Sequence, residues 1–181
     1  MSKTHTTAYF YKEVDSPVGR LKIVGSDKGL AAILWENDNP NRIRVRTYVE
    51  SNTHPVLLET ERQLKEYFEG KRTSFSLALD SIGTEFQQEV WNILAAIPYG
   101  ETRTYLDIAK QMGNVKAVRA VGAANGRNPI SIVVPCHRVI GSSGELTGFA
   151  GGLEAKAALL SMEGIKTGKT QIELPWGSAR V

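Results

Sequence analysis

The hydrophobic pattern of the chain changes character at Gly83, and this change limits the folds that are open to it. Before Gly83, short apolar runs alternate with turn residues, as in strands joined by tight connections. After it, apolar residues recur at helical spacing, as in the series Phe86, Val90, Ile93, Leu94 and Ile97. We therefore expect an α+β protein with a small mixed first part and a mainly helical second part.

The first part is predicted to contain an antiparallel meander and one helix. Turn residues separate three short apolar runs, so strands are expected at residues 9–14, 21–25 and 30–35. Residues 56–69 carry apolar side chains at helical spacing, and Gly70 follows as a helix stop. Residues 42–49 are ambiguous between strand and helix, and we favour a strand because basic residues alternate there with apolar or aromatic ones. Another strand is expected at residues 75–79, where large apolar residues alternate with small ones.

The second part carries clear helix-start signals. Capping-box patterns occur at residues 84–87 and 104–107, where a threonine is followed three residues later by glutamine or aspartate. Asn114 is expected to cap a third helix over residues 115–125. Two short helices joined by a Gly-Asn turn indicate a helix-turn-helix, although many such pairs bind nothing. A final helix is predicted over residues 153–163.

The chain has a single cysteine, Cys136, directly after a short apolar run at residues 132–134. This run is predicted to be a buried strand that Pro135 ends, since proline cannot donate to a ladder. A lone cysteine is most often a small buried hydrophobic residue. A nucleophilic cysteine needs a nearby base or positive charge to become thiolate, and His137 and Arg138 follow it. Both interpretations are open on these residues alone.

Composition and charge exclude some classes of protein and suggest another. Hydrophobic residues make up 41% of the chain, and no apolar run is long enough to span a membrane. Residues 1–7 are polar and lack a signal-peptide core, so we expect a cytoplasmic location, where a free thiol stays reduced. Residues 103–138 carry six basic side chains and one acidic one. This segment could contact DNA, or its charges could simply solvate a helix face.

The residues around Cys136 resemble the active-site motif of the bacterial-type O6-alkylguanine-DNA alkyltransferases. The likeness is carried by Asn128-Pro129 and by the run Pro135-Cys136-His137-Arg138, and it extends through residues 119–125, 151–153 and 163–164. The resemblance implies a ribonuclease H-like supporting domain at residues 1–82. It also implies a winged helix-turn-helix domain for DNA binding and alkyl transfer at residues 83–168, with a tail at 169–181.

The resemblance also implies catalytic roles. Cys136 would accept the alkyl group, and His137 would take the thiol proton through a bound water. Glu163 would orient the imidazole, Asn128 would hold the active-site loop, and Tyr105 would contact the flipped base. The residues themselves add one argument: Glu163 closes the last predicted helix, where the helix dipole disfavours an acid. An acid held there is expected to have a partner.

DNA and substrate contacts follow from the same likeness. Arg119 matches an arginine finger that fills the space left by the flipped nucleotide. Small and polar residues of the second helix of the pair are expected near the groove: Asn114, Ala117 and Ala120. The base pocket is expected to be formed by Pro135, Val139, Phe149, Ala150 and Gly151. Many relatives have tyrosine and serine in place of Phe149 and Ala150, so tolerance of bulkier alkyl groups is an open question.

The sequence therefore predicts a DNA repair protein that removes alkyl groups from O6-alkylguanine, and also from O4-alkylthymine, in double-stranded DNA. Cys136 would keep the group, so each molecule would act once, without cofactor or metal. We expect a monomer, with clustering along DNA an open possibility. One alternative is a non-catalytic protein that binds alkylated DNA, against which Cys136 argues. A cysteine hydrolase is another, although no further hydrolase signature accompanies Cys136 and His137.

Overall fold

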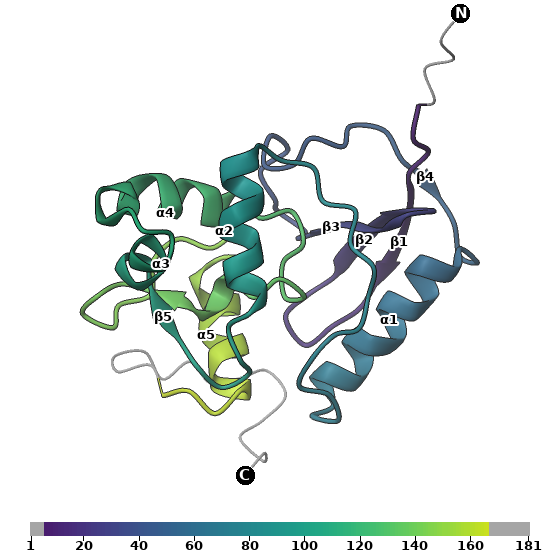
Figure 1. The fold of residues 1–181 in the computed structure, drawn as a ribbon. Helices are drawn as coiled ribbons and strands as arrows, with labels where there is room; N and C mark the ends of the chain where they lie inside the picture. Colours follow the sequence, from purple (N-terminus) through teal and green to yellow (C-terminus); the bar gives the residue numbers. More distant parts are fainter. Residues whose placement is uncertain (1–5, 167–181) are drawn as a thin grey trace, which may run out of the picture.

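Residues 6–166 are described here from a computed structural model. Figure 1 shows a sheet and one helix on one side of the molecule and the remaining helices gathered on the other. This is the expected α+β arrangement, and the change between its two parts falls near Gly83. The tail expected at residues 169–181 lies outside the described residues. Within residues 6–166, every helix is too short or too polar to cross a membrane.

Three antiparallel strands form the body of the sheet, as the sequence predicts. They are β1 (Phe10–Val14), β2 (Leu21–Ser26) and β3 (Gly29–Leu34), joined by two tight turns. In the first turn, Gly19 has a φ of 107°, and its N–H donates to the Ser16 carbonyl at 3.1 Å. A two-residue strand, β4 (Val49–Glu50), pairs parallel to β1 and completes the order β3-β2-β1-β4.

Helix α1 (Pro55–Phe68) packs against the three long strands and matches the helix expected at residues 56–69. Its start has two of the usual features. Pro55 stands in the first turn, where its missing N–H costs nothing, and the His54 ring accepts from the Val56 N–H at 3.2 Å. The buried face of α1 includes Leu57, Leu64 and Tyr67.

The two strands expected from alternation alone were wrong. Residues 42–44 form a bend and residues 45–48 have no regular secondary structure. The Arg42 side chain is buried, where it binds backbone carbonyl groups. In residues 75–79, Leu79 makes a single bridge with Leu30. An extended segment that packs on the core shows alternating burial. It becomes a strand only if it also forms hydrogen bonds along the edge of a sheet.

The second part consists of short helices and turns. It contains α2 (Glu85–Ala95), β5 (Arg103–Thr104), α3 (Tyr105–Gln111), the 3-10 turn η1 (Val115–Ala117), α4 (Val118–Gly126), the 3-10 turn η2 (Cys136–Arg138), β6 (Val139–Ile140) and α5 (Leu153–Met162). Both expected capping boxes are present, at Thr84 with Gln87 and at Thr104 with Asp107.

Helices α3 and α4 form the expected helix pair. The helix predicted at residues 115–125 begins as η1 and continues as α4, and Asn114 caps it by accepting from the Lys116 N–H at 3.2 Å. The two-residue strands β5 and β6 pair in parallel, which joins the start of α3 to the segment that follows Cys136. The helix pair is therefore fixed directly to the segment that carries the thiol.

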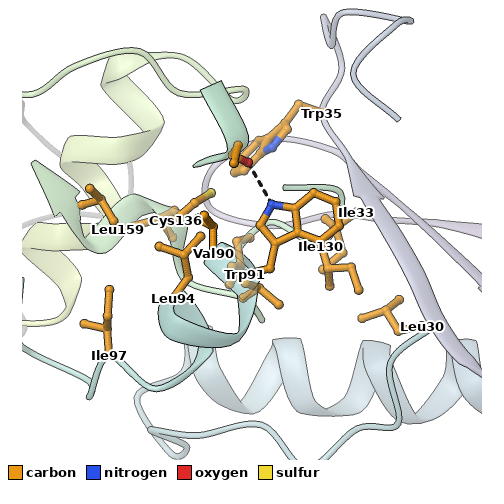
Figure 2. Close-up of a cluster of buried hydrophobic side chains, with 14 of the residues drawn as sticks. Leu30, Ile33, Trp35, Val90, Trp91, Leu94, Ile97, Ile130, Cys136 and Leu159 are labelled. Atoms are coloured by element: carbon orange, nitrogen blue, oxygen red, sulfur yellow. Dashed lines mark hydrogen bonds between the residues drawn. The ribbon is translucent and has the colours of Figure 1, made fainter. Parts of the chain in front are cut away.

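One hydrophobic core runs through both parts of the molecule. Figure 2 shows Leu30 and Ile33 from β3 in the same cluster as Val90 and Trp91 from α2. The Trp91 indole N–H donates to the carbonyl of Ala124 at 2.8 Å, which ties α2 to α4. Because the core is continuous, side chains of the first part can reach the surroundings of Cys136.

The segment before Cys136 is buried, but it is not the strand expected at residues 132–134. Ile132 has a φ of 74°, a left-handed conformation that interrupts any ladder and is strained for a β-branched residue. Val134 N–H donates to the Ile130 carbonyl at 2.9 Å, so the chain turns here. Ile130 instead forms a parallel bridge with Ile33, and the Ile33 N–H donates to the Pro129 carbonyl at 2.9 Å. The outer strand of the first part thus holds the start of this segment.

Candidate active site

Cys136 lies in the 3-10 turn η2, between the turn that Pro135 ends and strand β6. Its side chain is 4% exposed and packs in the core cluster. Burial raises the pKa of the Cys136 thiol, against the opposing effects of a hydrogen bond from Asn128 and the charges of Arg42 and Lys156. The thiol is therefore protonated at neutral pH and needs a base before it can act as a nucleophile.

His137 and Glu163 form a buried pair beside this cysteine. His137 Nε2 lies 2.7 Å from Glu163 Oε2, and both side chains are fully buried. An ionised carboxylate only accepts, so Nε2 carries the proton and Nδ1 has the free lone pair. Nδ1 is buried and has no hydrogen-bond partner among the described residues. Burial lowers the pKa of His137, with Glu163 opposing that shift, so the imidazole can serve as a base near neutral pH.

Glu163 has several partners, as its position at the end of α5 led us to expect. Arg138 Nε donates to Oε1 at 2.7 Å, and the Gly100 N–H donates to the same oxygen at 3.2 Å. The Tyr67 hydroxyl donates to Oε2 at 2.5 Å. Burial alone would raise the pKa of Glu163, but the hydrogen bonds from His137, Arg138 and Tyr67 outweigh it and lower that pKa to about 2.

Asn128 holds the turn that leads to Cys136. Its Nδ2 donates to the Val134 carbonyl at 2.8 Å, and its Oδ1 accepts from the Ile130 N–H at 3.1 Å. The Asn128 carbonyl accepts from the guanidinium of Arg42, which is also paired with Asp38 at 2.6 Å. Arg42 was not identified as a site residue from the sequence. The available signal was Asp38, four residues before it, which indicated a possible ion pair.

Tyr105 stands at the start of α3, and its hydroxyl shares a hydrogen bond with the Thr147 hydroxyl. It is half-buried, and burial raises its pKa, with the Thr147 bond opposing. The contact joins the helix pair to the loop between β6 and α5. Tyr105 therefore lies where the expected DNA-binding part and the expected base pocket meet.

Lys156 is a buried cation that sequence reasoning did not single out. Its Nζ donates to the Val139 carbonyl at 2.6 Å and to the Thr147 carbonyl at 3.1 Å. Burial lowers its pKa to about 8, against the effect of Cys136. A lysine among alanines and leucines in a helix gives little indication of such a role in the sequence. In the structure it joins α5 to β6 and to the middle of the loop between them.

Trp35, from the end of β3, supports the expected pocket residues. Its ring lies edge-on to Phe149, with centroids 5.3 Å apart, and its indole N–H donates to the Ser131 hydroxyl at 3.1 Å. Of the other expected pocket residues, Pro135 and Val139 are buried, whereas Ala150 and Gly151 are half-buried. Sequence reasoning missed Trp35 because it belongs to the first part of the chain.

Gly151 packs so closely on Trp35 that a larger residue will not fit. A Cβ atom on Gly151 would lie 2.6 Å from the indole ring, too close for ordinary contact. We expect Gly151→Ala to destabilise the protein by about 1–3 kcal/mol, the usual cost of overpacking a filled site. Gly148→Ala is the matched control, because a Cβ there meets nothing within 4 Å. Equal urea midpoints for the two variants would contradict this packing.

The helix pair presents most of the expected DNA-binding residues to solvent. Asn114, Arg119 and Ala120 are exposed, whereas Ala117 is buried at 8% exposure. Ala117 faces the core because η1 turns it inward, so we do not keep it among the residues expected to contact DNA.

Within residues 6–166, no group of three or more His, Cys, Asp or Glu side chains could hold a metal ion.

Family comparisons cover both parts of the chain. A family model described as "6-O-methylguanine DNA methyltransferase, ribonuclease-like domain" matches residues 9–81. A second, described as "6-O-methylguanine DNA methyltransferase, DNA binding domain", matches residues 85–165. The second match includes Cys136, His137 and Glu163.

Individual relatives match over nearly their whole length. A methylated-DNA–protein-cysteine methyltransferase of Methanosarcina acetivorans is 48% identical over 155 residues, which cover 86% of this chain and 98% of the relative. The protein of that name from Mycobacterium bovis is 48% identical over 158 residues, covering 84% and 91%. A crystal structure of Mycobacterium tuberculosis OGT in complex with DNA superposes with a TM-score of 0.77 at 44% identity, covering 85% of this chain and 92% of that one.

Proposed function

The chain belongs to the methylated-DNA–protein-cysteine methyltransferase family, and on that premise we propose that Cys136 is its alkyl acceptor. The protein repairs DNA by direct reversal, taking the alkyl group from O6-alkylguanine onto cysteine. The observation that carries the residue assignment is the buried arrangement of Cys136, His137 and Glu163 inside the matched region. O4-alkylthymine offers the same kind of carbon on oxygen, so we include it among the substrates.

The transfer is a displacement at an sp3 carbon. The Cys136 sulfur forms a bond to the alkyl carbon while the carbon–O6 bond breaks, and the electron pair of that bond goes to the purine. The purine takes up one proton as it leaves, which balances the proton that the thiol loses. His137 Nδ1 takes the thiol proton through a bridging water, because Nε2 is committed to Glu163 and Nδ1 has no direct partner among residues 6–166. The Glu163 carboxylate stabilises the imidazolium that results, as in other nucleophile–base–acid sets.

The damaged nucleotide has to leave the duplex to reach a buried thiol. Rotating it out costs a few kcal/mol, and an arginine that enters the vacated space offsets part of this cost. We assign that role to Arg119, which is exposed on α4. Asn114 and Ala120 lie on the exposed side of the same helix pair and would face the DNA. Tyr105 would contact the flipped base.

The loop between β6 and α5, together with the Cys136 turn, would form the base pocket. Carbonyl groups of Cys136 and Val139 would accept from the guanine amine, and the N–H groups near Ala150 and Gly151 would face O6. Phe149 and Pro135 would supply apolar walls, while Asn128 keeps the turn before Cys136 in place. Because Lys156 already donates to the Val139 carbonyl, the guanine amine would use its second lone pair.

The product is a thioether, a stable linkage from which the alkyl group does not leave the sulfur. We therefore expect one alkyl group per protein molecule and no turnover, without a cofactor. We place the protein in the cytoplasm, where reducing conditions keep the thiol free, and we expect it to act as a monomer.

Mass spectrometry after incubation with an O6-methylguanine duplex tests this function. We expect the intact chain to gain one methyl group, and the peptide that contains Cys136 to carry it. An excess of damaged DNA should not raise the yield beyond one methyl per chain. Tight binding to the lesion with the methyl group left on guanine would instead identify a non-catalytic lesion-binding protein.

A further inference from the structure

Tyr67 links the first part of the chain directly to the proposed active site. It lies on α1, yet its hydroxyl donates to Glu163 Oε2 at 2.5 Å, and its side chain is fully buried. We propose that Tyr67 is a positioning residue for alkyl transfer, which fixes the Glu163 carboxylate in the orientation that holds His137. The inference rests on the proposed function and assigns to the first part of the chain a role in the reaction.

The hydrogen bonds around Glu163 show what Tyr67 adds. Oε1 accepts from Arg138 and from the Gly100 N–H, which fix one oxygen. Oε2 accepts from His137 and from Tyr67. Without the Tyr67 hydroxyl, His137 would be the only hydrogen-bond partner of Oε2 among residues 6–166, and a rotation of the carboxylate would carry this oxygen away from the imidazole. Tyr67 therefore determines where the second oxygen stays.

The ring of Tyr67 is itself held on several sides. Its centroid lies 5.3 Å from that of Phe68, 5.4 Å from that of Phe75 and 6.3 Å from that of Tyr99. Burial, and then the charge of Glu163, raises the pKa of Tyr67 well above its ordinary value. The hydroxyl is therefore a donor throughout the range in which the protein works, and its direction is set by packing.

The charges around Glu163 predict how the loss of the Tyr67 hydroxyl would change the pH dependence of the reaction. Glu163 faces His137, Arg138 and Tyr67, and the charge of Lys156 also lowers the pKa of His137. Without this donor, Oε2 can turn away from Nε2, so His137 loses the negative charge that opposes the effect of burial, and the pKa of His137 falls further. A His137 that binds a proton more weakly is a weaker base for the thiol, so the reaction should be slower at neutral pH and its acid limit should lie at a lower pH than in the unchanged protein.

The test is Tyr67→Phe, which removes the hydroxyl and keeps the ring. The rate of methyl transfer from a methylguanine duplex is measured from about pH 5.5 to about pH 9. Each rate is normalised to the methyl group transferred at completion, so that misfolded molecules do not count. We expect a rate about tenfold lower near pH 7.5, the effect of one hydrogen bond to a charged group. The acid limb should move to lower pH.

Tyr11→Phe is the matched control, because it removes a hydroxyl from the same part of the chain, on β1, away from the site. Its pH profile should match that of the unchanged protein. A Tyr67→Phe profile that superimposes on this control would overturn the proposal. If the unchanged protein never gains a methyl group on Cys136, the proposed function has failed instead, so the two failures are distinguishable.

A double-mutant cycle separates positioning through Glu163 from a general structural role. If Tyr67 acts through the carboxylate, Tyr67→Phe should change the rate less than about twofold when Glu163→Gln is already present. A further tenfold loss on that background would show that Tyr67 acts elsewhere, and would overturn the proposal. If Glu163→Gln does not fold, the pH profiles of Tyr67→Phe and Tyr11→Phe decide the question alone.

Discussion

Replacing Cys136 with serine will abolish alkyl transfer while leaving the fold and DNA binding intact. A serine hydroxyl is far harder to deprotonate than a thiol, and its oxygen is a poorer nucleophile toward an sp3 carbon. His137, a base near neutral pH, cannot generate an alkoxide in useful amounts. We expect the rate to fall by on the order of 10⁴ or more, as when the nucleophile of other nucleophile–base sets is removed.

The measurement is the loss of methyl from a labelled O6-methylguanine duplex, together with the mass of the protein. Ser142→Ala is a suitable control, because Ser142 is exposed in the loop that follows β6. This variant should transfer methyl at the normal rate. Cys136→Ser should still bind the damaged duplex, with a urea midpoint close to that of the unchanged protein. Lesion repair by Cys136→Ser would rule out Cys136 as the acceptor.

The sequence correctly predicted those parts of the fold that are determined by interactions between residues close together in the chain. Capping at Thr84 and Thr104 depends on residues three positions apart, so the pattern alone locates these helix starts. The meander β1 to β3 follows from short apolar runs and tight turns. The failures at residues 42–49 and 132–134 have the opposite origin. There, Arg42 binds the carbonyl of Asn128 and Ile130 bridges to Ile33, and no local sequence pattern reports such distant contacts.

The same division applies to the site. Cys136 and His137 came from the resemblance, and Glu163 was also expected to need a partner because the helix dipole disfavours it. Tyr67, Trp35 and Arg42 were missed, since each reaches the site from the first part of the chain. Their side chains form hydrogen bonds with residues 86 to 96 positions away in the sequence. Such contacts can be identified only from the three-dimensional packing of the two parts of the chain.

Replacing Glu163 with alanine will destabilise the protein strongly, because it leaves a buried cation without its counterion. Arg138 Nε lies 2.7 Å from Glu163 Oε1, and both side chains are nearly or fully buried. Removing one member of a buried ion pair typically costs about 3–5 kcal/mol. Glu154→Ala is the control, because Glu154 is exposed on the same helix. Urea unfolding at neutral pH should separate the two variants clearly.

Glu163 should also make stability depend on pH, and the sign follows from its pKa. The folded value is about 2, whereas an unfolded glutamate titrates near about 4.3. As pH falls, the unfolded chain therefore takes up this proton first, so the contribution of Glu163 is present above about pH 5 and is lost toward about pH 2. Glu163→Gln cannot titrate, so its free energy of unfolding should fall less steeply across this window. Parallel curves for Glu163→Gln and the unchanged protein would mean that the carboxylate is not held as an anion in the fold, and the assignment of Glu163 as the anion that stabilises a protonated His137 would then fail with it.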